Sequence, residues 1–254
     1  MRLRYVDTHC HMSSDDFESD REDIISHAAD KGIAIISSAI VPEEWQKCVQ
    51  LARDFPSVHA AIGLDPELYG DIDLVKSWIG SNSEHIVAVG ETGLDHYIVR
   101  AHKKRAEQAH AFRQLIGLAK DLGLPVQVHS RSAGRRALEV LYECEADAVH
   151  MHAFDGRRSL ARSASHDHGY YFSVPTSVVR SQQKRKLVKA ISIERILLET
   201  DSPVLGPDRG ERNTPLNIFL ALEETARILR REPEELREIL LENTLRLYKQ
   251  MNYL

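Results

Sequence analysis

Cysteine is scarce in this sequence, and the arrangement of the few cysteines excludes two classes of protein. The 254 residues contain three, Cys10, Cys48 and Cys144, and no two of them have CxxC spacing. Such an odd, widely separated set provides neither the disulfide framework of a small secreted domain nor a cysteine-ligated zinc site. We therefore expect reduced thiols and a cytoplasmic location.

Long apolar runs and an excess of positive charge are also missing. The longest apolar run, GIAIISSAIV at 32–41, is about half as long as the roughly 20 residues that a membrane-spanning helix requires. Acidic and polar residues follow Arg2 and Arg4, where a signal peptide would have an apolar core. The net charge of −5 argues against a surface that is basic throughout, although a local basic patch remains possible. We expect no association with membranes, and the oligomeric state is not indicated.

Short runs rich in Val, Ile and Tyr alternate with longer amphipathic segments. Eight strand-sized runs are found at 3–9, 33–40, 58–64, 86–92, 124–129, 147–152, 170–174 and 195–200. Helical periodicity is clear at 20–31, 43–55, 71–79, 103–122, 132–143 and 182–191, and two more helices are expected at 216–230 and from Pro233 onward.

This alternation predicts the fold class. Strands that are apolar on both faces and separated by helices form parallel sheets. Eight of them in about 250 residues favour an α/β protein with a (β/α)8 TIM barrel and an extra C-terminal helix, built as a single domain over residues 1–254. An open doubly wound sheet is the alternative, but no glycine-rich phosphate-binding turn follows the first strand.

Side chains of the types that bind metals occur at the ends of five predicted strands. Because the carboxyl ends of barrel strands form one mouth, we expect these side chains to converge there. They are His9 and His11 after the first strand, Glu91 after the fourth, His129 after the fifth, His152 after the sixth and Asp201 after the eighth. An isolated HxH pair would be a weak signal, so the prediction depends on the complete set.

The chemistry of this set predicts the kind of metal centre. Imidazole and carboxylate groups suit zinc and similar first-row ions, so zinc is the first expectation, with magnesium or manganese as alternatives. Six ligands exceed the need of one tetrahedral ion, and we expect two divalent ions bridged by a carboxylate. His150 shares a strand face with His152 but is expected one layer deeper in the barrel.

The same residues lie in motifs that resemble a known family. In order, VDTHCHM, VGETGLDHY, LPVQVHSR, HAFDG, ILLETDSP and RGERNTP are similar to motifs of the TatD-type metal-dependent deoxyribonucleases of the amidohydrolase superfamily. The resemblance covers nearly the whole chain. It implies a (β/α)8 barrel with two divalent metals, hydrolase activity of which 3′-directed cleavage of DNA is the best-known example, and the six ligands named above.

The sequence departs from the family pattern in three places. The turn after the third strand reads GLDPE, with Asp65 and Glu67 where the family usually has histidines, so a phosphate contact is in doubt and a carboxylate there would repel an anionic substrate. Ala153 replaces a cysteine that is not a ligand, and Thr214 replaces a common glutamate.

A mechanism follows from the expected metal pair. Water bound to zinc can have a pKa of roughly 7 instead of about 15.7, which supplies a nucleophile at neutral pH. We expect Asp201 to take up its proton and pass it to the leaving oxygen. Glu91, as the shared carboxylate, is assigned to catalysis with Asp201.

Substrate contacts are predicted from the uneven distribution of charge. The segment SSDDFESDRED after the first strand is acidic, whereas the segments after strands four to seven contain many bases. A basic side of the mouth would attract a phosphate backbone. The predicted substrate-binding residues are Arg131, Asp65, Arg209 and Arg212.

The most strongly indicated function is thus a metal-dependent phosphodiesterase that acts on DNA. The first alternative keeps the metals but cleaves an amide or ester of a substrate other than nucleic acid, because fold and metal do not fix the substrate. The second is a metal-binding barrel without catalytic activity.

Overall fold

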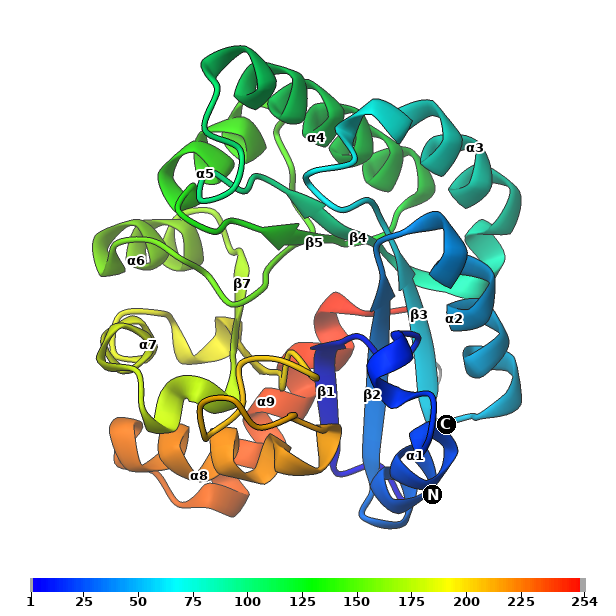
Figure 1. The fold of residues 1–254 in the computed structure, drawn as a ribbon. Coiled ribbons are helices and arrows are strands. Elements are labelled where there is room, and N and C mark those ends of the chain that lie inside the picture. The colour runs from blue at the N-terminus through cyan, green and yellow to red at the C-terminus, as the bar shows by residue number, and fades with distance from the viewer. Residues whose placement is uncertain (1, 252–254) are drawn as a thin grey trace.

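Eight strands form one parallel sheet in the order of the chain. In the computed structural model, which describes residues 2–251, the strands are β1 (Tyr5–Cys10), β2 (Ile33–Ala39), β3 (Val58–Ile62), β4 (Ile86–Gly93), β5 (Val126–His129), β6 (Val149–Met151), β7 (Tyr171–Val174) and β8 (Ile196–Leu198). Each pairs in parallel with the next one. Figure 1 shows them at the centre of a ring of helices, which confirms the predicted TIM barrel.

The barrel closes between the first and the last strand at their carboxyl ends. The amide of Asp201 donates to the carbonyl of His9 at 2.9 Å, and the amide of His11 donates to the carbonyl of Ser202 at 2.8 Å. The hydroxyl of Thr8 adds a bond of 2.8 Å to the carbonyl of Leu198. These bonds hold the segment after β8 against the end of β1, so two predicted site segments lie side by side.

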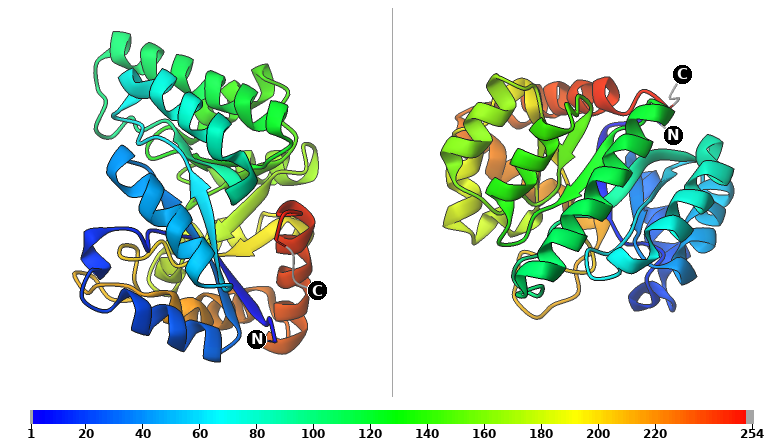
Figure 2. Two further views of the ribbon diagram at one scale, coloured as in Figure 1. Left: turned by 90° about the vertical axis from the view of Figure 1, so that its right-hand side faces the viewer. Right: turned by 90° about the horizontal axis from the view of Figure 1, so that it is seen from above.

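Nine helices within residues 2–251 surround the sheet and close its end. They are α1 (Arg21–Asp30), α2 (Pro42–Asp54), α3 (Ile72–Asn82), α4 (His102–Leu122), α5 (Gly134–Glu143), α6 (Arg158–His166), α7 (Gln182–Val188), α8 (Ile218–Leu229) and α9 (Pro233–Leu247). Two views in Figure 2 show these helices covering the outside of the strands. None of them is both long and apolar enough to cross a membrane.

The helices agree with the predicted ranges to within a few residues, with one omission. Pro233 begins α9 and Gly123 ends α4 in a left-handed conformation with φ of 65°, as expected for these residue types. The periodicity analysis did not single out α6. Its nine residues are mostly small and polar, so their apolar stripe is short.

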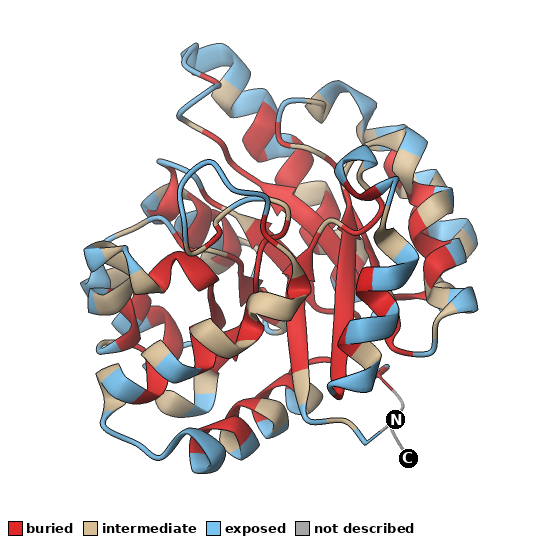
Figure 3. Ribbon diagram, turned by 60° about the horizontal axis from the view of Figure 1, so that its bottom comes forward, coloured by how far each residue is buried: buried red, intermediate tan, exposed pale blue. Residues whose placement is uncertain are grey.

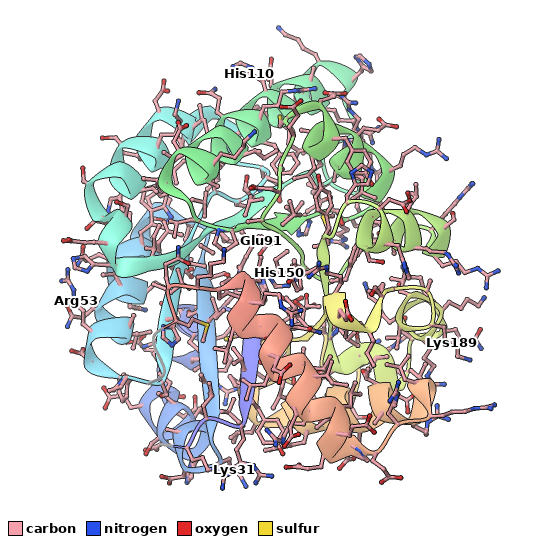
Figure 4. The ribbon with its side chains drawn as sticks, turned by 180° about the vertical axis from the view of Figure 1, so that it is seen from behind. Lys31, Arg53, Glu91, His110, His150 and Lys189 are labelled. Carbon is pink, nitrogen blue, oxygen red and sulfur yellow. The ribbon has the colours of Figure 1, made fainter. Side chains whose placement is uncertain are left out.

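The apolar core has two layers, one outside and one inside the barrel. Alternate side chains of each strand pack against the surrounding helices, and Figure 3 shows the strands as the buried centre of the molecule, with exposed residues on the outer helix faces. The inner layer includes Ile36, Tyr171 and Leu197, together with Tyr248 and Met251, which follow α9. Seen from behind in Figure 4, α9 lies across the barrel. The opposite end of the barrel is the mouth.

Two glycines allow β4 to pass close to its neighbours. A Cβ on Gly63 would lie 2.1 Å from the carbonyl oxygen of Glu91, and one on Gly93, whose φ is +145°, would lie 2.1 Å from the carbonyl oxygen of His129. Backbone atoms cannot withdraw from such a contact without moving a strand. Both contacts involve the backbones that carry predicted site residues.

We predict that Gly93→Ala lowers the free energy of unfolding by at least about 2 kcal/mol, because it combines a backbone clash with a strained φ. Gly117→Ala is the matched control, since a Cβ there meets nothing within 4 Å, and should leave stability equal or raise it by about 0.4–1 kcal/mol. Urea unfolding measures both variants. Equal stability of the two would contradict the close approach of β4 and β5.

Candidate metal centre

The carboxylate of Glu91 lies between two pairs of imidazoles at the mouth of the barrel. Its Oε2 is 3.2 Å from Nε2 of His9 and 3.5 Å from Nε2 of His11. Its Oε1 is 2.6 Å from Nδ1 of His129 and 3.6 Å from Nε2 of His152. Figure 4 shows Glu91 near the middle of the barrel. Each carboxylate oxygen therefore faces a different pair of ring nitrogens, from strands on different sides of the barrel.

Asp201 completes this cluster from the end of β8. Its Oδ1 lies 3.7 Å from Nε2 of His9 and 3.5 Å from Nε2 of His11. Three overlapping groups, His9 with His152 and Asp201, His9 with His11 and Glu91, and Glu91 with His129 and His152, each have potential ligand atoms within 4.8 Å of one another. The structure thus brings together all six residues that the sequence analysis named as metal ligands, in positions where they could hold metal.

Hydrogen bonds to the other ring nitrogen orient His9 and His11. Nδ1 of His9 lies 3.1 Å from Oε1 of Gln127, an acceptor, so Nδ1 carries a hydrogen and Nε2 is the nitrogen that faces the centre. Nδ1 of His11 likewise donates to the backbone carbonyl of Ser38 at 3.0 Å. Nε2 of His9 is completely buried, and no hydrogen-bond partner satisfies it within the described residues. A buried ring nitrogen without a hydrogen-bond partner fits a site for a metal ion.

Carboxylates orient the other two imidazoles. Nδ1 of His152 donates to Oε2 of Glu199 at 3.0 Å, which leaves Nε2 facing Glu91. Nε2 of His129 donates to Oδ2 of Asp95 at 3.1 Å, so here Nδ1 faces the centre. Partners of this kind fix the tautomer of a metal-binding histidine and raise its basicity. All four histidines therefore direct their second ring nitrogen toward the same centre.

The charges of the cluster shift the pKa values of its members. Burial alone would raise the pKa of Glu91, but His152, His129 and His9 outweigh it and hold this pKa well below its usual range. Burial would lower the pKa of His129, yet Asp95 and Glu91 raise it to about 10. Burial does dominate for His152 and lowers its pKa to about 3. At neutral pH the centre thus has an ionised Glu91 and a neutral His152.

A cavity of about 430 Å³ opens next to this cluster and exposes it to substrate. His129, His152 and Asp201 lie in its wall, together with Arg131 and Lys184. The ammonium group of Lys184 donates to the carbonyls of Ala153 at 2.6 Å and Phe154 at 2.9 Å. In the described chain no carboxylate forms an ion pair with it, so a positive charge is held beside Asp201.

The four residues predicted to contact substrate lie in different surroundings. Arg131 lines the cavity, and Asp65 is partly buried after β3, where its Oδ1 accepts the amide of Glu67 at 2.7 Å. Burial raises the pKa of Asp65, as does the nearby charge of Glu91. Arg209 is exposed in the loop after β8.

The side chain of Arg212 is engaged in contacts within the protein. Its guanidinium forms an ion pair with Asp20 and donates to the carbonyl of Asp16 at 2.7 Å. It also lies over the ring of Phe17, 5.0 Å from its centroid. These contacts tie the loop after β8 to the segment after β1, and a contact of Arg212 with substrate stays a prediction.

The sequence analysis missed most of the residues that orient the ligands. Asp95 and Glu199 stand inside motifs quoted above, GLDHY and LLETDSP, but only the ligands in those motifs were assigned a role. Lys184 was not singled out, because it is one of many basic residues in the segments after strands four to seven. A search for further carboxylates in the motifs that already carry a ligand carboxylate, Glu91 or Asp201, would have found the first two. The residues of the site that the sequence analysis missed are Asp95, Glu199, Gln127, Ser38 and Lys184.

His150 lies below the centre, as its position on the strand indicated. Its Nε2 is 2.6 Å from the hydroxyl of Ser173 and its Nδ1 is 2.6 Å from the hydroxyl of Tyr248. With both ring nitrogens bonded inside the barrel, His150 connects the centre to the segment after α9 (Figure 4).

A parallel barrel whose mouth gathers imidazoles and a shared carboxylate is the architecture of metal-dependent hydrolases. Comparison with known proteins identifies the family. Residues 6–249 match the family model described as TatD related DNase, and the chain therefore belongs to the TatD family.

Relatives match the chain over almost its full length. Human deoxyribonuclease TATDN3 is 38% identical, over 98% of this chain and 96% of its own. The uncharacterized metal-dependent hydrolase YabD of Bacillus subtilis is 32% identical, over 96% and 98%. The solved structure of the TatD homolog YjjV from Escherichia coli has 26% identity and a TM-score of 0.88, over 98% of this chain and 99% of that one.

We predict that Glu199→Gln lowers the affinity for divalent metal by about 10- to 100-fold, the usual effect of losing a partner of a metal-binding histidine. Glu199 is fully buried and its two oxygens accept three hydrogen bonds, from His152, the amide of Ala153 at 2.9 Å and the hydroxyl of Ser173 at 2.6 Å. A glutamine nitrogen would oppose a donor at one of these positions.

The exposed Glu194→Gln is the control, because it makes the same change near the start of β8 without touching the centre. Competition with a chromophoric chelator measures both affinities. If the two variants bind metal as tightly as the unmodified protein, the orienting role of Glu199 is wrong.

Proposed function

We propose that this protein is a divalent-metal-dependent hydrolase that cleaves phosphodiester bonds in DNA. The observation that carries the proposal is the pairing of each Glu91 oxygen with its own set of imidazole nitrogens. That arrangement matches two adjacent ions that share one carboxylate. The names of the TatD relatives support hydrolysis and, for the vertebrate proteins, DNA as substrate.

The ligands divide into two sets. His9, His11 and Asp201 would hold one ion with one oxygen of Glu91, and His129 and His152 would hold the second with the other oxygen. Nitrogen and carboxylate donors favour zinc, with magnesium and manganese as the other candidates. When bound, such ions supply Lewis acidity and lower the pKa of water in their coordination sphere.

The chain supplies groups for the remaining chemistry. Asp201 lines the cavity, and its Oδ1 lies 3.7 Å from His9 and 3.5 Å from His11, so it is placed to take up a proton from attacking water and return it to the leaving oxygen. Lys184 and Arg131 add positive charge in the same cavity, where a phosphate would enter. We also assign the reaction to a single domain spanning the chain and to the cytoplasm, where the thiols of Cys10 and Cys48 remain reduced.

One observation favours a second candidate function, hydrolysis of an amide or ester that has no phosphate. Asp65 places a carboxylate near Glu91 and His129 at the mouth, and an ionised group there would oppose a phosphate but not a neutral substrate. The two candidates differ in substrate and share the metal centre.

The central test is removal of a ligand. We predict that His129→Ala or His152→Ala binds fewer than two ions per chain and loses more than about 100-fold in kcat on DNA. This loss exceeds the effect of about 10- to 100-fold that is usual when a residue that only orients a metal ligand is removed. His110→Ala, an exposed histidine of α4, should behave as the unmodified protein. Elemental analysis gives the metal content, and a labelled oligonucleotide gives the rate.

Retention of both metal content and rate by either ligand variant would contradict the assignment. The same assay with aminoacyl, amide and lactone substrates distinguishes the two candidate functions. Turnover of one of these in place of DNA would replace the phosphodiesterase by the second candidate.

Asp65→Asn tests the electrostatic argument for the substrate. The asparagine oxygen can still accept the amide of Glu67, so the turn keeps its shape while a negative charge near the centre is removed. We expect KM for an oligonucleotide to fall about three- to tenfold, with kcat for a neutral ester unchanged. The control is Asp208→Asn, an exposed residue with the same change in net charge. An equal effect of both variants would mean that only the total charge matters.

A further inference from the structure

A second cavity lies beside the mouth and takes no part in the proposed chemistry. It has a volume of about 470 Å³ and lies among the loops that follow β4, β5 and β6. His96, residues 132–136, residues 155–157 and Leu160 line it. Asp155 also lines the mouth cavity, so the two hollows adjoin. A ligand at the metal centre could therefore extend into this second cavity.

The second cavity has positive charge that the protein itself does not neutralise. Within residues 2–251, the guanidinium groups of Arg135 and Arg157 have neither a hydrogen bond nor a carboxylate within 4.0 Å, whereas Glu139 and Glu143 pair with Arg136. Unpaired guanidinium groups that converge on a hollow are typical of sites for phosphate.

The backbone around the second cavity adds to this preference. The helix α5 begins in its wall at Gly134, and α6 begins directly after the lining residue Arg157. Neither helix has a side chain that caps its first turn. Free amide groups at a helix start favour an anion. Asp155 is the one acidic residue in this part of the described chain, and its Oδ2 accepts the amide of Ser132 at 2.8 Å.

An exposed aromatic ring stands where the two cavities meet. Tyr97 is 53% exposed although the guanidinium of Arg131 stacks on it, 3.9 Å from the ring centroid. Arg131 lines the mouth cavity, and its carbonyl accepts the amide of His96, which lines the second cavity, at 2.9 Å. Exposed aromatic rings next to phosphate-binding groups stack the bases of single-stranded nucleic acid.

We propose that the second cavity binds the backbone phosphate next to the scissile one in a single-stranded nucleic acid, with the neighbouring base stacked on Tyr97. The inference rests on the proposed phosphodiesterase activity. It predicts that the nucleic acid runs from the metal centre across the loops after β4, β5 and β6. A strand with unstacked bases fits, because a duplex offers no base face to an aromatic ring at the protein surface.

The test compares two double variants with equal loss of charge. Arg135→Ala with Arg157→Ala removes the phosphate contacts, and Arg162→Ala with Lys189→Ala removes two exposed bases outside the cavity, one in α6 and one directly after α7. Binding of a fluorescein-labelled, single-stranded hexathymidylate is measured by anisotropy between 50 and 200 mM salt. Turnover is measured on the same oligomer and on the p-nitrophenyl ester of thymidine 5′-phosphate, which lacks a second backbone phosphate.

We expect the cavity variant to bind the oligomer about tenfold more weakly and to reduce the slope of log affinity against log salt by about 0.7, the value for one neutralised phosphate of a single strand. Its loss of kcat/KM should be at least about fivefold larger on the oligomer than on the small ester. Tyr97→Ala should weaken binding by about fivefold or more. The control variant should match the unmodified protein.

Equal losses in the two double variants, or unchanged binding by the cavity variant, would overturn the subsite. So would an unmodified protein that does not bind the oligomer. A protein that cleaves neither phosphodiester yet shows the selective loss of binding would sustain the subsite and reject the proposed function. If the alanine pair does not fold, as judged by circular dichroism, the corresponding glutamine pair gives the same comparison.

Discussion

The site depends on one carboxylate shared between four imidazoles. Each imidazole is held in place by a hydrogen bond to the ring nitrogen that faces away from that carboxylate. Glu91 could not remain ionised in a buried position without positive charge on both sides, and the imidazoles supply it in the absence of metal. An imidazole that could rotate would turn its ring nitrogen away from the centre. The bonds from His9 to Gln127 and from His152 to Glu199 prevent that rotation. The centre is therefore held open for cations by groups outside it.

Those outer groups form a continuous hydrogen-bonded layer inside the barrel, below the mouth. The hydroxyl of Tyr248 accepts a bond of 2.8 Å from Gln127 and lies 2.6 Å from Nδ1 of His150. From there Ser173 leads to Glu199, which holds His152. The segment after α9 thus orients imidazoles from opposite sides of the barrel, because Tyr248 contacts both branches. This explains why a barrel whose strands are already complete has an additional helix packed across its far end.

The sequence predicted the fold and the inner members of the site because both follow simple periodicities. Alternating runs defined the strands, and strand ends defined which polar residues would meet. The outer members could not be found this way. Glu199 belongs to the predicted strand run 195–200, but only coordinates show that it reaches the imidazole of His152 on another strand. Lys184 stands on α7 among several exposed bases, and its position beside Asp201 depends on how that helix packs. The ion pair of Arg212 with Asp20 likewise joins residues far apart in the sequence.

The charges around the mouth favour one direction of approach. On the side of β1, the acidic segment keeps part of its negative charge, since Arg212, Lys47 and Arg21 pair with only three of its six carboxylates. On the side of β5 and β6, Arg131 and Lys184 have no carboxylate partner within residues 2–251. A polyanion is thus repelled along one edge and attracted along the other, and at physiological salt both effects act over about 8 Å. The metal ligands lie between these two edges. The same asymmetry of charge that attracts a nucleic-acid strand to the metal centre therefore also determines on which side of the mouth the rest of that nucleic acid lies.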